Sequence, residues 1–217
     1  MENAILGSAL LFTTTVMPVN PIVAGQPMFL SSSPVAVNQS VASETLDLKT
    51  RSPFPTVNEG FSDNILLSLH YLNGEKFSAG QVNWEEIRKP FKVSFVLGTG
   101  QTFAFHDIVL PEYQNPTVTL NSNFTMKDGY KFVAGLPGSG VCHLATLMTW
   151  VSKEAGLEVT ALASHDFAPV NGVDRKYGTS IMSNSATQNL YIKNTTGVPL
   201  VFEFMASEDS VVFSILK

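Results

Sequence analysis

The alternation of hydrophobic and polar residues divides the second half of the chain into short strands. Residues 92–97 and 102–110 both alternate in this way, and the glycine-containing segment 98–100 between them predicts a hairpin. Segment 195–197, Thr-Thr-Gly, predicts a second turn, joining two antiparallel strands. The other strand-like runs are 157–163, 189–194, 199–206 and 210–216.

Two segments have the hydrophobic spacing of helices. In the first, Ser62 can cap the helix, Asp63 suits its positive first turn, and Phe61 can pack onto Leu66. The second follows a proline- and glycine-rich turn, opens near Cys142, and has its apolar positions at Val141, Leu144, Ala145, Met148, Val151 and Ala155. The pattern predicts an α+β fold, in which a mainly antiparallel sheet is accompanied by segregated helices.

The beginning of the chain differs from the rest. Residues 4–18 are apolar but short for a membrane span, so we expect segment 1–24 to be a signal peptide or an apolar anchor. Segment 25–57 is rich in Ser, Ala, Val and Pro without a clear period, which is typical of a linker. The folded domain is therefore expected over 58–217.

Composition excludes several classes of protein. A net charge of -5 with scattered basic residues argues against nucleic acid as a partner. The single cysteine excludes an intrachain disulfide. No nucleotide-binding loop and no metal-ligand spacing is present, so we expect neither a cofactor nor a bound metal.

Cys142 is the strongest chemical candidate, because it lies where a glycine-rich turn becomes a helix. The positive end of a helix stabilises a thiolate, which lowers the pKa of the thiol and makes it reactive. His165 follows a predicted strand and could act as general base, with Asp174 or Asp166 orienting its imidazole. Backbone N–H groups of the turn and helix start could bind an oxyanion, with Gly138, Ser139, Gly140, Val141 and His143 as candidate binding residues.

Two other interpretations of the same residues stay open. The glycine-rich turn could hold a carboxylate or glycan at the helix start without catalysis. Cys142 could also be a packing residue only, because lone cysteines are often buried. A hydrogen bond between His165 and the sulfur in an open cleft would favour the enzyme, whereas burial of both would favour the structural role.

Several segments together resemble the VanW-like family. They are GQTFAFHDIV, DGYKFVAG, GSGVCHLATLM, SHDFAPVNGVDRKYGTSI and LYIKNTTGVPLVFEF, and the resemblance as a whole extends over about residues 60–205. The positions that carry the resemblance are Phe103, Phe105, Gly129, Tyr130, Gly138, Gly140, Val141, Cys142, His165, Pro169, Gly172, Asp174 and Asn194. Three residues depart from the family pattern, namely His106, Ser139 and His143.

The resemblance implies a location in the extracytoplasmic cell envelope and peptidoglycan or its precursors as the partner, but it supplies no reaction. We therefore expect a protein that binds or modifies peptidoglycan. If it is an enzyme, Cys/His-based acyl transfer or amide hydrolysis is the expected chemistry. The alternative is a non-catalytic wall-binding or structural module.

Overall fold

The computed structural model describes residues 39–217, so the expected signal peptide or anchor and residues 25–38 of the expected linker lie outside the described residues. The described part contains three α-helices: α1 (Pro55–Leu72), α2 (Trp84–Ile87) and α3 (Val141–Glu154). Its strands are β1 (Ser40–Asp47), β2 (Phe91–Leu97), β3 (Thr102–Ala104), β4 (Phe132–Val133), β5 (Leu136–Pro137), β6 (Glu158–Thr160), β7 (Tyr191–Lys193), β8 (Leu200–Ala206) and β9 (Ser210–Leu216). Every strand pairing within the sheets is antiparallel, which confirms the expected α+β class.

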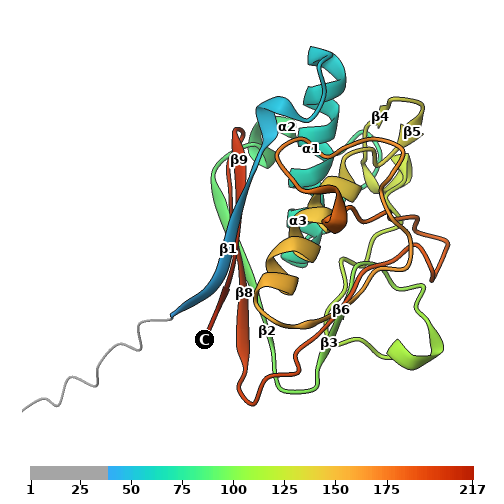
Figure 1. Ribbon diagram of the computed structural model, residues 1–217. Coiled ribbons are helices and arrows are strands. Elements are labelled where there is room, and N and C mark those ends of the chain that lie inside the picture. Colours follow the sequence, from blue (N-terminus) through green and yellow to red (C-terminus); the bar gives the residue numbers. More distant parts are fainter. Residues whose placement is uncertain (1–38) are drawn as a thin grey trace, which may run out of the picture. The chain divides into compact units, whose positions relative to one another are not determined.

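The largest sheet has the strand order β1-β9-β8-β2, and α1 and α3 lie on one of its faces (Figure 1). Alternate residues of β8 and β9 point toward these helices, so Phe202, Phe204, Phe213 and Ile215 are fully buried. The rings of Phe204 and Phe213 stack with centroids 4.3 Å apart. Helix α3 packs against β1 and β9.

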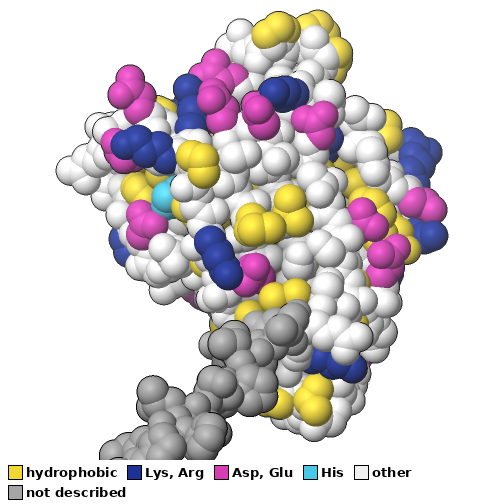
Figure 2. Space-filling view, turned by 90° about the vertical axis from the view of Figure 1, so that its left-hand side faces the viewer, with side chains coloured by type: hydrophobic (Ala, Val, Ile, Leu, Met, Phe, Trp, Pro, Cys, Tyr) yellow, Lys and Arg dark blue, Asp and Glu magenta, His cyan; other side chains and the backbone are white. Residues whose placement is uncertain are grey.

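The opposite face of this sheet is open to solvent. Figure 2 shows small groups of hydrophobic side chains on that side, separated by polar and charged ones. Lys92 and Glu203 form a cross-strand ion pair there at 2.6 Å, and Ser43 and Ser214 share a hydrogen bond of 2.7 Å. The mixture is typical of a solvated sheet face.

Strand β1 lies in the segment that we expected to be a linker. It pairs with β9 from Ser40 to Asp47, and the buried side chains of Leu46 and Leu48 join the core. The expectation of a linker up to residue 57 is therefore wrong for residues 40–57. The alternation was hidden because β1 is an edge strand built largely from small and polar residues, which edge strands tolerate.

The two expected hairpins do not form, because each connection passes from one sheet to another. Strand β2 pairs with β8, whereas β3 pairs with β7 in a three-stranded sheet of order β3-β7-β6. The turn after β2 and the turn after β7 lie side by side, where buried Asn194 donates hydrogen bonds to Leu97 O (2.8 Å) and Val198 O (2.9 Å). Asn194 thus links the turn after β2 to the turn after β7.

Helix α1 begins two turns earlier than expected. Pro55 occupies its first turn, and Ser62 lies inside the helix, where its hydroxyl donates to Leu48 O at 2.7 Å. Asp63, Asn64 and Ser68 are also buried and have partners. The helix is therefore enclosed on its polar side as well as its apolar side, a burial that hydrophobic spacing alone does not reveal.

Candidate functional site

The glycine-rich turn before α3 is a packing junction with α1. Gly138 and Gly140 have positive φ angles of 68° and 106°. A Cβ atom would lie 2.7 Å from Phe124 O at Gly138 and 2.5 Å from Phe61 O at Gly140. Both glycines are therefore needed so that the backbone can approach neighbouring backbone closely.

Asn64 of α1 fixes this junction from the other side. Its buried amide donates to Ser139 O at 2.9 Å and to Lys131 O at 3.0 Å, and its oxygen accepts from Lys131 N at 2.8 Å. The Ser139 hydroxyl donates to Val133 O at 2.8 Å. The polar groups of the turn are thus used to hold α3 onto α1.

The first N–H groups of α3 are likewise occupied. Val141 N donates to Gly138 O at 3.2 Å, and His143 N donates to Gly140 O at 2.9 Å. Val141 is itself only 5% exposed. Two of the N–H groups that we expected to bind an oxyanion or a carboxylate, those of Val141 and His143, are therefore engaged within the turn.

The Cys142 sulfur faces Ile181. Ile181 N donates to it at 3.3 Å, and the side chain packs against the hydrophobic core. Burial raises the pKa of the Cys142 thiol, and this effect exceeds the opposing effect of the hydrogen bonds from backbone N–H groups. The expected lowering of this pKa is therefore wrong in direction.

We expect native Cys142 to react slowly with iodoacetamide below about pH 8.5, because a thiol with a raised pKa supplies little thiolate there. Unfolding in urea should remove the burial and increase the labelling rate by at least about tenfold at pH 8. Mass spectrometry of labelled protein with and without urea measures both rates. The His165→Ala variant should label like the wild type, and rapid native labelling at pH 7 that depends on His165 would restore the catalytic role.

His165 is oriented by backbone rather than by a carboxylate. Its Nδ1 donates to Ala168 O at 2.8 Å. Asp166 accepts instead from the Ser164 hydroxyl at 3.1 Å, and exposed Asp174 pairs with Lys176. Within residues 39–217, no hydrogen bond joins His165 to Cys142, Asp166 or Asp174, so the expected triad geometry is not present.

The structure instead brings together His143 and His165. Their rings meet edge to face with centroids 5.8 Å apart, and Phe61 lies on another side of His143 at 5.4 Å. Burial lowers the pKa of His143 to about 3, with smaller contributions from Arg51 and His165. His143 and Cys142 are adjacent on the helix, so their side chains point about 100° apart, and His143 rather than Cys142 faces His165.

Sequence reasoning missed Arg51, which lies beside this pair. It is 6% exposed, and it was placed in the expected linker because no periodic pattern surrounds it. A lone arginine before a Pro-containing segment gives no signal of burial. Its position became evident only from the contacts that β1, η1 (Leu48–Thr50) and the segment 164–173 make in the structure.

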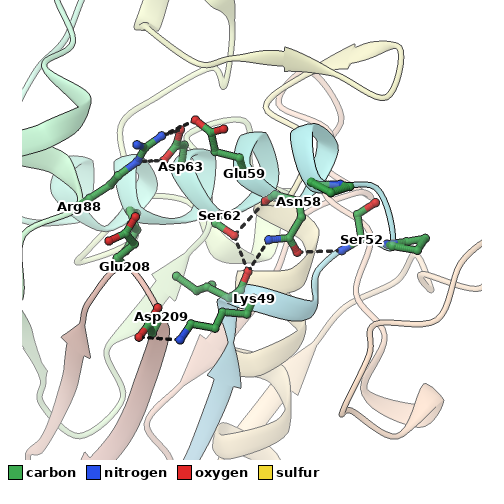
Figure 3. Close-up of a pocket in the computed structure, with 13 residues that line it drawn as sticks. Lys49, Ser52, Asn58, Glu59, Ser62, Asp63, Arg88, Glu208 and Asp209 are labelled. Carbon is green, nitrogen blue, oxygen red and sulfur yellow. Dashed lines mark hydrogen bonds and ion pairs between the residues drawn. The ribbon is translucent and has the colours of Figure 1, made fainter.

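A pocket of about 570 Å³ lies along the first half of α1 (Figure 3). Its apolar part includes Leu48 and Leu66, and its rim carries Lys49 and Arg88. The lining residues are Leu48, Lys49, Ser52, Pro53, Pro55, Asn58, Glu59, Ser62, Asp63, Leu66, Arg88, Glu208 and Asp209. Both signs of charge meet around one concave surface, so a polar ligand with both acidic and basic groups would find partners there.

Ion pairs organise one wall of this pocket. Arg88 Nε and Nη2 donate to the two carboxylate oxygens of Asp63 at 2.8 and 2.7 Å, and Lys131 also pairs with Asp63. Glu59 joins the same two cations from the solvent side. Lys49 pairs with Asp209 at 2.9 Å on another wall, where both side chains are largely exposed. The ion pairs of the first wall are therefore centred on a buried carboxylate, whereas Lys49 and its partner are both exposed and can exchange partners.

Among residues 39–217, no group of three or more His, Cys, Asp or Glu side chains is arranged to hold a metal ion. No helix in the same range combines the length and hydrophobicity that crossing a bilayer requires.

The fold and the junction define an α+β module in which a Gly-x-Gly turn docks the start of one helix onto an earlier one. The family described as VanW like protein matches residues 93–216, which is more than half of the chain, and the chain belongs to this family. The match spans β2 to β9 and α3, while β1 and α1 precede it. No curated protein and no solved structure matches the chain.

Proposed function

We propose that the protein is an extracytoplasmic module of the cell envelope that binds peptidoglycan or its precursors without catalysing a reaction. Membership of the VanW-like family supports the association with the envelope. The observation that carries the binding role is the pocket along α1, whose volume of about 570 Å³ is typical of ligand sites. The partly buried thiol of Cys142, whose pKa is raised, does not favour Cys/His-based acyl transfer or amide hydrolysis.

The chemistry of the pocket fits a stem peptide. Such peptides carry carboxylates, amides and ammonium groups on a short chain with small apolar side chains. Lys49 and Arg88 can pair with carboxylates, Glu208 and Asp209 can pair with ammonium groups, and Leu66 offers apolar contact. Of these charged groups, Lys49 can change partner most easily because its side chain is 65% exposed and its present partner Asp209 is 60% exposed.

The Lys49→Glu variant is expected to bind purified insoluble peptidoglycan about tenfold more weakly than the wild type, because a charge-assisted hydrogen bond to a ligand carboxylate becomes a repulsion. Stability should change little, since the lost Lys49–Asp209 pair is exposed. Sedimentation of the full-length chain with peptidoglycan, quantified over a concentration series, measures this difference.

Lys127→Glu is the matched control, because Lys127 is exposed, does not line the pocket, and changes the net charge by the same amount. It should bind like the wild type. Failure of the wild type to sediment with peptidoglycan would refute the proposed function. Equal weakening by both variants would show a general charge effect and remove the pocket from the proposal.

A further inference from the structure

Arg51 is a buried cation without a carboxylate partner. Its guanidinium donates to three oxygens, all of them neutral: Nε to Asp47 O at 2.5 Å, Nη2 to Asn171 O at 3.0 Å, and Nη2 to the Thr50 hydroxyl at 3.2 Å. Within the described residues, Arg51 forms no ion pair with any carboxylate. Asp47 favours the charge of Arg51 from a distance but makes no ion pair with it, so a directly paired anion would stabilise this buried guanidinium.

Two nitrogen atoms in this region have no hydrogen-bond partner. They are Nη1 of Arg51 and Nδ1 of His143, and the two residues are 6% and 5% exposed. Buried polar atoms in folded proteins nearly always have partners, so each of these two atoms requires an explanation. Ser152 Oγ also lacks a partner, but it lies in the last turn of α3, more than two helical turns from His143.

Helix α1 and the segment 164–173 contact both Arg51 and His143. Arg51 is tied to the first turn of α1 by its N–H, which donates to Asn58 Oδ1 at 2.6 Å, and to the segment 164–173 by its bond to Asn171 O. His143 contacts α1 through Phe61 and the same segment through His165. The charge of Arg51 contributes to the lowered pKa of His143, which agrees with their closeness.

We propose that Arg51 and His143 form a binding site for a single carboxylate group, beneath the segment 164–173. One oxygen would accept from Nη1 of Arg51 and the other from Nδ1–H of His143. The site offers one positive charge, because His143 is neutral at pH 7. A monoanion with two acceptor oxygens matches this set, whereas phosphate would bring a larger group and a second charge without a counter-ion.

Only a thin layer separates the proposed site from solvent. In the segment 164–172 the buried residues are His165 and Val170, while the other side chains are exposed, including Phe167 at 76%. The whole stretch between β6 and β7 has a single 3₁₀ turn, η4 (Arg175–Tyr177), as regular structure. Long loops of this kind are typical of segments that open over ligand sites. A carboxylate could therefore enter by displacement of this segment, without opening the core.

The test uses the full-length protein with sodium acetate as the carboxylate and acetamide as its uncharged analogue, at constant ionic strength. Acetate should raise the midpoint of thermal unfolding in a saturable manner, with a Kd on the order of 1 mM for so small a ligand. Acetamide should have no such effect, and inorganic phosphate should act more weakly than acetate. Absence of an acetate effect, or an equal effect of acetamide, would overturn the site and leave water as its occupant.

His143→Phe keeps an aromatic ring against Phe61 but removes Nδ1, so it should weaken acetate binding about tenfold. Arg51→Met removes the charge and should abolish binding. Because Arg51→Met could fail to fold, the wild type is also titrated with ¹⁵N-labelled arginine and histidine. Acetate should shift the side-chain nitrogen signals of Arg51 and His143, and shifts confined to other residues would overturn the proposal.

This site is independent of the proposed function, and the two can fail separately. Lys49→Glu alters the pocket along α1 and should leave the acetate response unchanged, since the exposed Lys49 side chain pairs with Asp209 and forms no hydrogen bond or ion pair with Arg51 or His143 in the described structure. Loss of the acetate response in Lys49→Glu would assign the anion effect to that pocket and overturn the Arg51 site. Absence of peptidoglycan sedimentation with a retained acetate response would refute the proposed function alone.

Discussion

Replacing Asp63 by alanine is expected to lower the free energy of unfolding by about 2–3 kcal/mol, because the charge-assisted hydrogen bonds of a buried carboxylate are lost while Arg88 and Lys131 keep Glu59 as a partner. The Asp63 side chain is 2% exposed and accepts two hydrogen bonds from Arg88, at 2.8 and 2.7 Å, in addition to its pair with Lys131. Its removal leaves both cations against the buried wall of α1 without their central partner. Equilibrium unfolding in urea, monitored by circular dichroism, measures the loss.

Glu59→Ala is the matched control for this prediction. Glu59 pairs with the same two cations, Arg88 at 2.5 Å and Lys131 at 3.2 Å, but its side chain is 56% exposed. Surface pairs of this kind contribute about 1 kcal/mol or less, so this variant should remain close to the wild type. Equal losses in Asp63→Ala and Glu59→Ala would show that burial does not govern the contribution of these ion pairs.

The second large effect is expected for Gly140→Ala, which should destabilise the protein by about 3 kcal/mol or more, since it combines a strained backbone with a steric clash. The φ angle of Gly140 is 106°, and an added Cβ would lie 2.5 Å from Phe61 O and 2.9 Å from Phe61 Cα. Both contacts are with backbone, so relief requires α1 and α3 to move apart. The change in urea midpoint at constant slope measures the effect.

Gly172→Ala separates the cost of the strained backbone from the cost of the steric clash. Gly172 also has a positive φ, 81°, but nothing lies within 4 Å of an added Cβ. This variant should lose only about 1–2 kcal/mol, the cost of the left-handed conformation. If Gly140→Ala were no worse than Gly172→Ala, the docking of the turn on Phe61 would not be the reason for glycine at residue 140.

If both predictions hold, the stability of the site region derives from α1, which lies before the part of the chain that matches the VanW-like family. Asp63 and Asn64 organise the wall of the pocket and the glycine-rich turn from adjacent positions of this helix. Phe61 contacts both the turn and the ring of His143. The family-matched residues 93–216 therefore depend on α1 for the shape of the glycine-rich turn and of the surroundings of His143.

Much of the secondary structure could be predicted from the sequence, because local alternation sets the exposure of each strand face. The strands β2, β8 and β9 and the helix α3 were expected close to where they occur, and so was the α+β class. The pairing of the strands could not be predicted in the same way. Alternation determines which residues point inward but not which strand lies alongside, so β2 and β3 were expected to form a hairpin that the crossing at Asn194 prevents.

In the candidate site, too, the sequence determined some features and the tertiary structure decided others. The sequence alone determined that a glycine-rich turn precedes α3 and that Cys142, His143 and His165 lie near its start or in a later loop. Only the tertiary structure decided that Cys142 packs toward Ile181 and that His143 meets His165 and Phe61. The reason is that adjacent helical residues point about 100° apart, and the orientation of the helix on its neighbours selects which one faces the loop. Arg51 became a site residue for a similar reason, since its burial arises from contacts with Asn58 and with Asn171, 120 residues away in the sequence.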